Sequence, residues 1–313
     1  MISLGYITAR KECRYDWLFD SICLQAGLES LKQIILIDFF AQPFDNWTED
    51  DIKRRWEMIA RQANDAGIYN YIEWHPPMPT VWAGPGRVTK DNWWHASTAR
   101  NTVFAYAKHD YVCCLDDRCV LMPTWMDGMR QGEKDQYVVC GTYDKRTDMT
   151  VEKGVIKHGG TIIGKDGRFT HTQGHKFQAP GSWLFGCTFG LPLEWALRVN
   201  GFPADYCDSL SMEDVIFGGL LVNNGYPMFF DPRSKIVEDR SLPFIGEAMK
   251  RTDKGVSPDD KSHKTLEVFA KAKTSMNHYD LRALREDTLR GKAFPKATLP
   301  THDWYDGQAV KDF

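Results

Sequence analysis

The sequence predicts an α/β fold with a mixed, mostly parallel sheet flanked by helices and followed by a helical C-terminal extension. Two observations support this prediction. Strand-like and helix-like segments alternate from residue 2 to residue 116, which is typical of β-α-β units and of parallel strand pairing. The chain also has 313 residues, 42% of them hydrophobic, which is enough to bury a substantial core.

The first third of the chain supplies the β-α-β opening. Short runs rich in Ile, Leu, Tyr and Phe predict strands, because such residues favour extended backbone. Thr48 and Asp51 have the spacing of a capping box at the start of a helix. The predicted elements are, in order, strand 2–7, helix 16–28, strand 33–40, a helix from this capping box to about residue 66, and strand 69–74.

A segment rich in Pro and Gly, 75–92, separates this opening from the rest and predicts a long loop, which in a compact domain is usually functional or mobile. The elements predicted after it are helix 93–107, strand 111–115, helix 124–129, strand 137–143, a hairpin within 154–164, a strand or turn into a short helix within 183–202, helix 211–226 and strand 228–232. We expect one α/β domain over 1–240 and a basic, mainly helical extension over 241–313.

Composition indicates a cytoplasmic protein without a membrane span. The net charge is −3, and the eight cysteines contain no CxxC pair and lie partly in apolar runs, so we interpret them as reduced. No apolar run approaches the ~18 residues that a spanning helix requires. Residues 250–296 carry a charge of +5 against −8 elsewhere. This segment is either a solvated helix pair or a surface for a polyanion.

An acidic motif follows the apolar strand at 111–115. Asp116 and Asp117 are adjacent, with Arg118 next. Two carboxylates at roughly 4 Å repel by about 4 kcal/mol at an effective dielectric constant of about 20, so a positive charge usually compensates. A metal ion, a cationic ligand or Arg118 could supply it. Ligands of open α/β sheets bind at the carboxyl ends of strands, and the motif occupies such an end.

Four segments in order resemble the nucleotide-sugar glycosyltransferases of the GT-A (Rossmann-like) fold, especially family two. They are 2–10 (ISLGYITAR), 35–40 (ILIDFF), 96–129 with the Arg-Asn pair and the acidic motif, and 186–232 with a Gly-Gly-Phe-like turn, the Glu-Asp pair and Gly225. The resemblance covers about residues 1–232. It implies inverting transfer of a sugar from a nucleotide-sugar donor, expected to be UDP-linked, to an acceptor hydroxyl.

The resemblance also implies the reacting groups. Asp116 and Asp117 would hold Mn²⁺ or Mg²⁺ at the diphosphate, where a cation stabilises the departing charge. Asp214 would be the general base, with Glu213 beside it as the second catalytic candidate. Family members usually have an aspartate where this chain has Arg118, which would therefore support the metal at the diphosphate or partly replace it. Asp214 could instead cap a helix from Ser211.

Further site residues follow from the same resemblance. Asp38 would accept a hydrogen bond from the uracil or ribose, and Arg100 would face the phosphates. The remaining donor-side candidates are Thr8, Ala9, Arg10, Asp116 and Arg118. On the acceptor side we expect Trp183 and the loop 75–92. His171 and His175 are four residues apart like a metal-binding pair, but Gly174 between them argues against the helix that such a pair needs.

The general motif leaves the acceptor open among a glycan, a lipid-linked saccharide, a protein and a hydroxymethylated pyrimidine in phage-type DNA. DNA stays an alternative because the basic extension could neutralise phosphates while aromatic side chains stack on a flipped base. Two other classes are a nucleotidyltransferase and a non-enzymatic sugar-binding protein. The former normally has a Gly-rich phosphate loop after the first strand, where this chain reads ITARKE.

Overall fold

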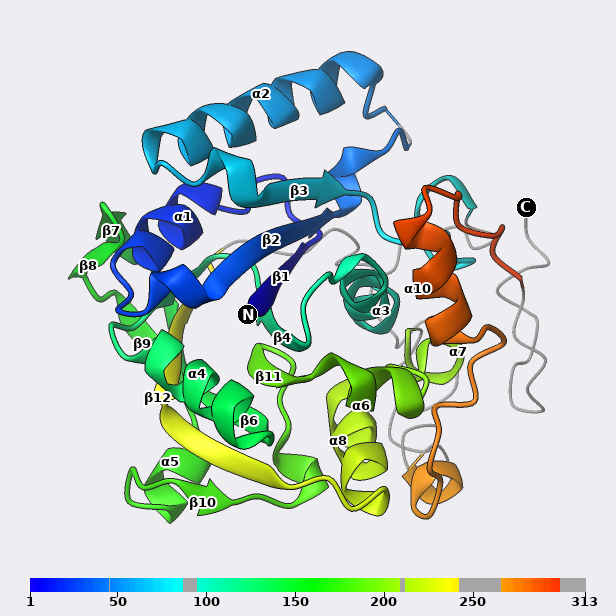
Figure 1. Ribbon diagram of the computed structural model, residues 1–313. Helices are drawn as coiled ribbons and strands as arrows, with labels where there is room; N and C mark the ends of the chain where they lie inside the picture. Colours follow the sequence, from blue (N-terminus) through cyan, green and yellow to red (C-terminus); the bar gives the residue numbers. More distant parts are fainter. Residues whose placement is uncertain (45, 87–94, 209–211, 242–265, 299–313) are drawn as a thin grey trace, which may run out of the picture.

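The computed structural model describes residues 1–44, 46–86, 95–208, 212–241 and 266–298. A ten-stranded sheet crosses the molecule with helices on both faces (Figure 1). The strand order is β10-β12-β6-β11-β4-β1-β2-β3, with β5 added to β12 and β9 added to β6. The bounds are β1 Ile2–Thr8, β2 Leu31–Asp38, β3 Ile72–His75, β4 Tyr111–Asp116, β5 Cys119–Leu121, β6 Val138–Thr147, β9 Thr161–Lys165, β10 Phe177–Gln178, β11 Thr188–Pro192 and β12 Met228–Asp239.

The direction of the strands brings several carboxyl ends to one edge of the sheet. β1 is parallel to β2 and β4, β2 is parallel to β3, and β12 is parallel to β6. β11 is antiparallel to both β4 and β6, so β6 runs in the same direction as β4. The ends of β1, β4, β6 and β12 therefore meet at the same edge, together with the start of β11.

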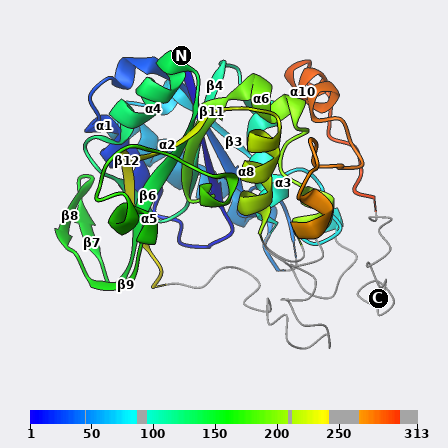
Figure 2. The ribbon, with the colours of Figure 1, turned by 90° about the horizontal axis from the view of Figure 1, so that it is seen from below.

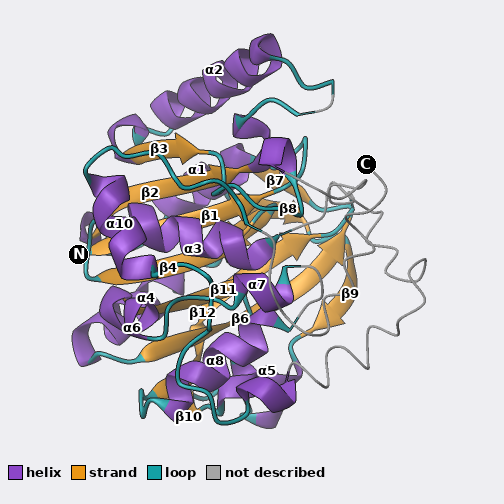
Figure 3. Cartoon of the chain, turned by 90° about the vertical axis from the view of Figure 1, so that its right-hand side faces the viewer, coloured by secondary structure: helices purple, strands orange, loops and turns teal. Residues whose placement is uncertain are grey.

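The central strands are buried on both faces, which explains their continuous apolar runs. In β2, Ile34 and Leu36 belong to one core cluster, whereas Ile35 and Ile37 belong to the other. Figures 2 and 3 show the two helical layers. The helices of the first layer are α1 (Tyr15–Cys23), α2 (Glu49–Asp65) and α4 (Trp125–Asp135), and those of the second are α3 (Ala96–Tyr106), α6 (Leu193–Arg198), α8 (Glu213–Asn223) and α10 (Leu281–Leu289).

The predicted capping box is confirmed at the start of α2. The Thr48 hydroxyl accepts a hydrogen bond from the Asp51 backbone N–H at 3.3 Å, and the Asp51 carboxylate accepts one from the Thr48 N–H at 2.9 Å. Other predicted ends of strands and helices differ from those in the structure. The predicted strand at 69–74 begins with a 3₁₀ turn, η3 (Tyr69–Tyr71), and the first helix ends at Cys23. The predicted start of the third helix, at 93, lies outside the described residues.

The hairpin predicted within 154–164 is wrong, because the two strands of that segment, β8 and β9, do not pair with each other. β7 (Thr150–Glu152) and β8 (Val155–His158) make a separate two-stranded sheet, whose turn residues Lys153 and Gly154 both have positive φ, as a type I′ turn requires. The next strand, β9, returns to β6 instead. β12 also continues past Pro232 to Asp239, with a shift in register between Phe230 and Lys235 that accommodates the proline.

The described part of the predicted extension, 266–298, packs on the second helical layer (Figure 3). Leu281 and Leu284 of α10 lie in the same core cluster as α3 and α8. The side-chain amides of Asn223 and Asn224, at the end of α8, donate to backbone carbonyls of 270, 272 and 273. In this part of the chain the extension therefore shares its core with the sheet domain. The lysines and arginines at 250–264 lie outside the described residues.

Candidate active site

A cleft of about 430 Å³ lies at the shared carboxyl edge of the strands. Its residues come from the ends of β4, β6 and β12, from the segment before β11, and from α3 and α8. They are Arg100, Asp116, Tyr143, Lys145, Phe185, Gly186, Cys187, Glu213, Asp214 and Arg240. The structure thus brings together Arg100, Asp116 and the Glu-Asp pair, which are far apart in the sequence, as the resemblance implied.

Arg100 joins the two acidic parts of the cleft. Its side chain is 3% exposed, and its guanidinium donates to Asp116 at 2.9 Å and to Glu213 at 3.1 Å. Burial opposes the charge, but these carboxylates raise the pKa of Arg100 above its usual value. The arginine therefore compensates the charge of Asp116 and offsets part of the repulsion between the paired aspartates.

Asp214 faces the cleft from the first turn of α8. One carboxylate oxygen accepts from the Gly186 backbone N–H at 3.0 Å, and the other accepts from the Val215 N–H at 2.8 Å. Burial and the neighbouring Asp214 raise the pKa of Glu213. Ser211, the other half of the alternative capping box, lies outside the described residues. Asp214 is thus oriented by backbone donors. Among the described residues it forms no close ion pair, although the charge of Arg100 acts on it from a greater distance.

Gly186 permits the close packing of this corner. A Cβ atom at this position would lie 2.2 Å from Nη2 of Arg100, a distance that no real Cβ contact shows. The absence of a side chain therefore lets the arginine pass over the segment that also donates to Asp214. This explains why the Gly-Gly-Phe-like turn noted in the sequence has a glycine here.

Asp117 belongs to a buried network behind the cleft. It is 1% exposed, accepts a hydrogen bond from the Thr8 hydroxyl at 2.6 Å and forms an ion pair with Arg10. Burial raises its pKa to about 6, although Arg10 and Thr8 act in the opposite direction. Thr8, Arg10 and Asp117 therefore hold one another, and none of them lines the cleft. Ala9 is also buried, in a small cluster with Phe39.

Arg118 points away from the cleft, which differs from both expectations for it. Its backbone has a φ of 53°, a left-handed conformation that is uncommon for a non-glycine residue. The guanidinium donates to the Glu12 carbonyl at 2.7 Å and forms an ion pair with Asp239. Because this side chain is 6% exposed, it fixes the strand end to the first loop, and other cations line the cleft.

Asp38 is likewise occupied by the protein. It is fully buried, and its carboxylate accepts from Arg55 at 2.5 Å, from Tyr15 at 2.7 Å and from Trp74 at 3.0 Å. A contact with a uracil or ribose would replace one of these bonds. The structure therefore shows a structural centre where the resemblance implied a donor contact.

Trp183 does not line the cleft either. Its ring packs on His171, Phe177 and Phe230, with centroids 5.4, 5.7 and 6.0 Å away. This packing also explains His171, which closes an aromatic cluster. Within the described ranges, no three His, Cys, Asp or Glu side chains form a group that could hold a metal ion.

The cleft also has lining residues that no sequence motif indicated, namely Tyr143, Phe185, Cys187, Lys145 and Arg240. Tyr143 and Lys145 are two residues apart on β6, so they share one face of the strand. That alternation is visible in the sequence. It becomes informative only when β6 is known to run parallel to β4, because the prediction of strand 137–143 gave neither its direction nor its full length.

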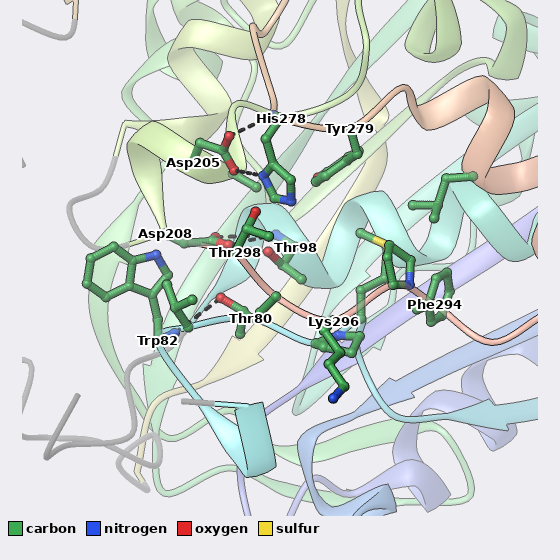
Figure 4. A pocket seen from close by; sticks show the side chains of 17 residues that line it. Thr80, Trp82, Thr98, Asp205, Asp208, His278, Tyr279, Phe294, Lys296 and Thr298 are labelled. Carbon is green, nitrogen blue, oxygen red and sulfur yellow. Dashed lines mark hydrogen bonds and ion pairs between the residues drawn. The ribbon is translucent and has the colours of Figure 1, made fainter. Parts of the chain in front are cut away.

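The loop predicted on the acceptor side lines a different and smaller pocket, of about 30 Å³ (Figure 4). Thr80 and Trp82 face residues of the C-terminal segment there. At its base Asp208 accepts hydrogen bonds from the backbone N–H groups of Ser97, at 2.9 Å, and Thr98, at 3.2 Å, and so caps α3. The space suits one or two water molecules. The part of the loop at 87–92 lies outside the described residues.

The mostly parallel sheet with an acidic cleft at its carboxyl edge defines a GT-A fold, as predicted. Residues 87–189, a third of the chain, match Glycosyl transferase family 2, which confirms the resemblance. The crystal structure of GalNAc-T7 with UDP, GalNAc and Mn²⁺ has a similar fold, with a TM-score of 0.59 and 15% sequence identity over 94% of this chain. The chain spans about half of that structure, 55%. No match was found among curated proteins.

Membrane insertion has no support in the helices. Throughout the described parts of the chain, none of them combines the length and the apolar character that crossing a bilayer requires.

Proposed function

We propose that the protein is an inverting glycosyltransferase that moves a sugar from a UDP-linked donor to an acceptor hydroxyl. One observation carries this proposal. A single cleft at the strand ends is lined both by Asp116, at the end of β4 and paired with Arg100, and by Asp214, in the first turn of α8. A leaving diphosphate and an attacking hydroxyl need these two kinds of group on opposite sides of a sugar.

Asp214 is the general base in this proposal. Its backbone hydrogen bonds fix the direction of the carboxylate, so one oxygen can take the proton of the acceptor hydroxyl. The hydroxyl oxygen attacks the anomeric carbon from the face opposite the diphosphate, and the bond from that carbon to the phosphate oxygen breaks. Its electron pair leaves with UDP, so the configuration at the anomeric carbon inverts. Glu213 is held by Arg100 and is the second candidate for the base.

A divalent metal ion fits the Asp116 side of the cleft. The Asp116 side chain is 19% exposed, and one of its oxygens is engaged by Arg100. Mg²⁺ is commonly held by one or two carboxylates together with substrate phosphates and water, so a group of three protein ligands is not required. Mn²⁺ or Mg²⁺ would neutralise charge on the departing diphosphate. The Mn²⁺ in the similar GalNAc-T7 structure supports this choice.

Within this proposal Asp117 supports Asp116 from behind and contacts the donor only if its bond to Thr8 or Arg10 is exchanged. The acceptor stays open among the classes named above. The eight cysteines are free thiols in the structure, which agrees with the reduced state expected from the sequence. The cytoplasmic location stays a prediction.

A ligand screen followed by product analysis tests the function. The melting temperature is measured with UDP- and GDP-linked sugars, with Mn²⁺ and with a chelator, since a ligand of the native state raises it. We expect a UDP-sugar with Mn²⁺ to give the largest rise in melting temperature. When a saccharide or hydroxymethylated DNA is then added as acceptor, UDP should be released from the donor. Release of pyrophosphate would instead identify a nucleotidyltransferase. Binding of free saccharides but of no nucleotide sugar would identify a sugar-binding protein.

A further inference from the structure

Lys145 lines the cleft from strand β6. On β6 the side chains alternate between two faces, and the ion pairs show which residues share a face. Asp144 pairs with Arg146 at 3.3 Å and with Lys235 at 2.9 Å, whereas Tyr143 and Lys145 line the cleft. The ammonium group of Lys145 lies 4.8 Å from the centre of the Tyr143 ring.

The three cations of the cleft differ in their partners. Arg100 is engaged by Asp116 and Glu213. Arg240 lies 2.6 Å from a carboxylate oxygen of Glu238. In the described part of the chain, Lys145 has no carboxylate oxygen within 4.0 Å and donates no hydrogen bond. Its three donor hydrogens therefore remain available to a ligand, in a cleft whose neighbouring wall is the aromatic ring of Phe185.

The position of this charge suits an anion that also approaches Asp116. Both residues line one cleft, and β11 alone separates their strands in the sheet. A lysine is a compact point charge that commonly binds phosphate. Its attraction to an anion is strengthened where neighbouring rings exclude water. A diphosphate placed between the two residues would thus have the ammonium group of Lys145 on one side and the carboxylate of Asp116 on the other.

We propose that Lys145 binds the diphosphate of the donor and places its positive charge on the leaving group. This inference rests on the proposed function. As the bond between the anomeric carbon and the phosphate oxygen breaks, the electron pair passes to that oxygen, and the ammonium group stabilises the added negative charge through a charge-assisted hydrogen bond. The proton of the acceptor goes to Asp214, and Lys145 keeps its own. It thus supplies the second cation that the sequence had led us to expect from Arg118.

Binding of UDP and of uridine separates this contact from the rest of the site. The dissociation constants of both are measured by calorimetry, with Mn²⁺ and with a chelator, for Lys145→Met and Lys145→Arg. Lys157→Met is the matched control, because Lys157 is a 56% exposed lysine on β8 outside the cleft. We expect Lys145→Met to weaken UDP binding about tenfold to a hundredfold, the effect of losing a hydrogen bond to a charged group.

Uridine binding should be unchanged in all three variants, and Lys145→Arg should restore most of the affinity for UDP. Equal UDP binding by the wild type and by a folded Lys145→Met variant would overturn the inference while leaving the glycosyltransferase proposal standing. Equal losses for UDP and uridine would also overturn it, since they would show a general change in the site. If the wild type binds no nucleoside diphosphate, the proposed function fails and this inference with it.

Discussion

At the scale of single residues, the proposed reaction needs one of two adjacent carboxylates, Asp214 or Glu213, to take the proton of the acceptor. Asp214→Asn keeps the size of the side chain and its acceptor oxygen but removes the basic charge. We expect kcat to fall by about 10²–10⁴ while the affinity for UDP hardly changes. Steady-state kinetics on the folded variant check this. If the variant turns over at more than about a tenth of the wild-type rate, Asp214 is not the base, and Glu213→Gln becomes the variant to test.

The paired aspartates should separate by phenotype, because one is in the cleft and the other behind it. Asp116→Asn should weaken Mn²⁺-dependent UDP binding and leave stability within about 1 kcal/mol. Asp117→Asn removes the charge that faces buried Arg10, so it should lower the free energy of unfolding by about 3 kcal/mol. Calorimetry and denaturant unfolding on both variants make the comparison. Equal effects of both changes on UDP binding, without loss of stability, would contradict this division.

The resemblance grouped Asp116, Arg100, Glu213 and Asp214 at one site from the sequence. The structure places all four in one cleft, while their roles stay predictions. Asp38 could not be judged in this way, because its partners Arg55, Tyr15 and Trp74 lie on three other elements. The same holds for Arg118, whose ion pair depends on Asp239, 121 residues further along the chain.

At the scale of elements, the segment before β11 controls where Arg100 lies. Gly186→Ala would place a methyl group against the guanidinium and shift it, and displacements near 1 Å can cost about 10² in rate. We expect kcat/KM to fall at least tenfold while the far-UV circular dichroism spectrum is retained. Gly219→Ala, on α8 with no atom within 4 Å of the added carbon, is the control and should keep its activity. An active Gly186→Ala enzyme would show that the close approach is dispensable.

A second prediction concerns the edge strand β3 and the dependence of the free energy of unfolding on pH. Burial alone would raise the pKa of Glu73, but His75 and Lys108 lower it to about 2. Because the folded value lies below the unfolded value of 4.5, this carboxylate stabilises the fold above about pH 4.5 and loses that effect as the pH falls towards 2. Glu73→Gln should therefore cost about 1 kcal/mol at pH 6 and progressively less towards pH 3.5.

Denaturant unfolding of the wild type and of Glu73→Gln at several pH values measures this difference directly. Glu152→Gln, on the small sheet of β7 and β8, serves as a surface control, because Glu152 is 71% exposed. A difference between wild type and Glu73→Gln that stays constant from pH 6 to pH 3.5 would contradict the assignment.

Most elements were predictable because continuous apolar runs mark the buried central strands, and a helical spacing of apolar residues marks amphipathic helices such as α2. The exceptions have identifiable causes. The predicted hairpin began at Gly154, but the two-residue turn lies at Lys153 and Gly154, where both φ angles are positive, and it joins β8 to the preceding strand β7. β12 was predicted too short because Pro232 normally ends a strand. The bulge that admits it depends on the pairing with β6.

At the scale of the whole molecule, α10 packs into the same hydrophobic core as α3 and α6. Leu281 is fully buried in that core, so Leu281→Ala should lower the free energy of unfolding by about 2–5 kcal/mol. Leu289, in the same helix, is 43% exposed, and its replacement by alanine should cost less than about 0.5 kcal/mol. Urea unfolding of both variants tests this. Equal small losses would show that the core is complete without α10.

The packing of α10 against α3 also has a consequence for the synthesis of the chain. α3 carries Arg100, but the helix that covers it is made some 180 residues later, and the Asp214 side of the cleft appears in between. A ribosome-bound chain that ends before α10 would therefore carry an uncovered apolar surface beside an almost complete site. Such a chain would expose this apolar surface to aggregation until α10 is synthesised, and we expect the cleft to reach its folded form only after that point.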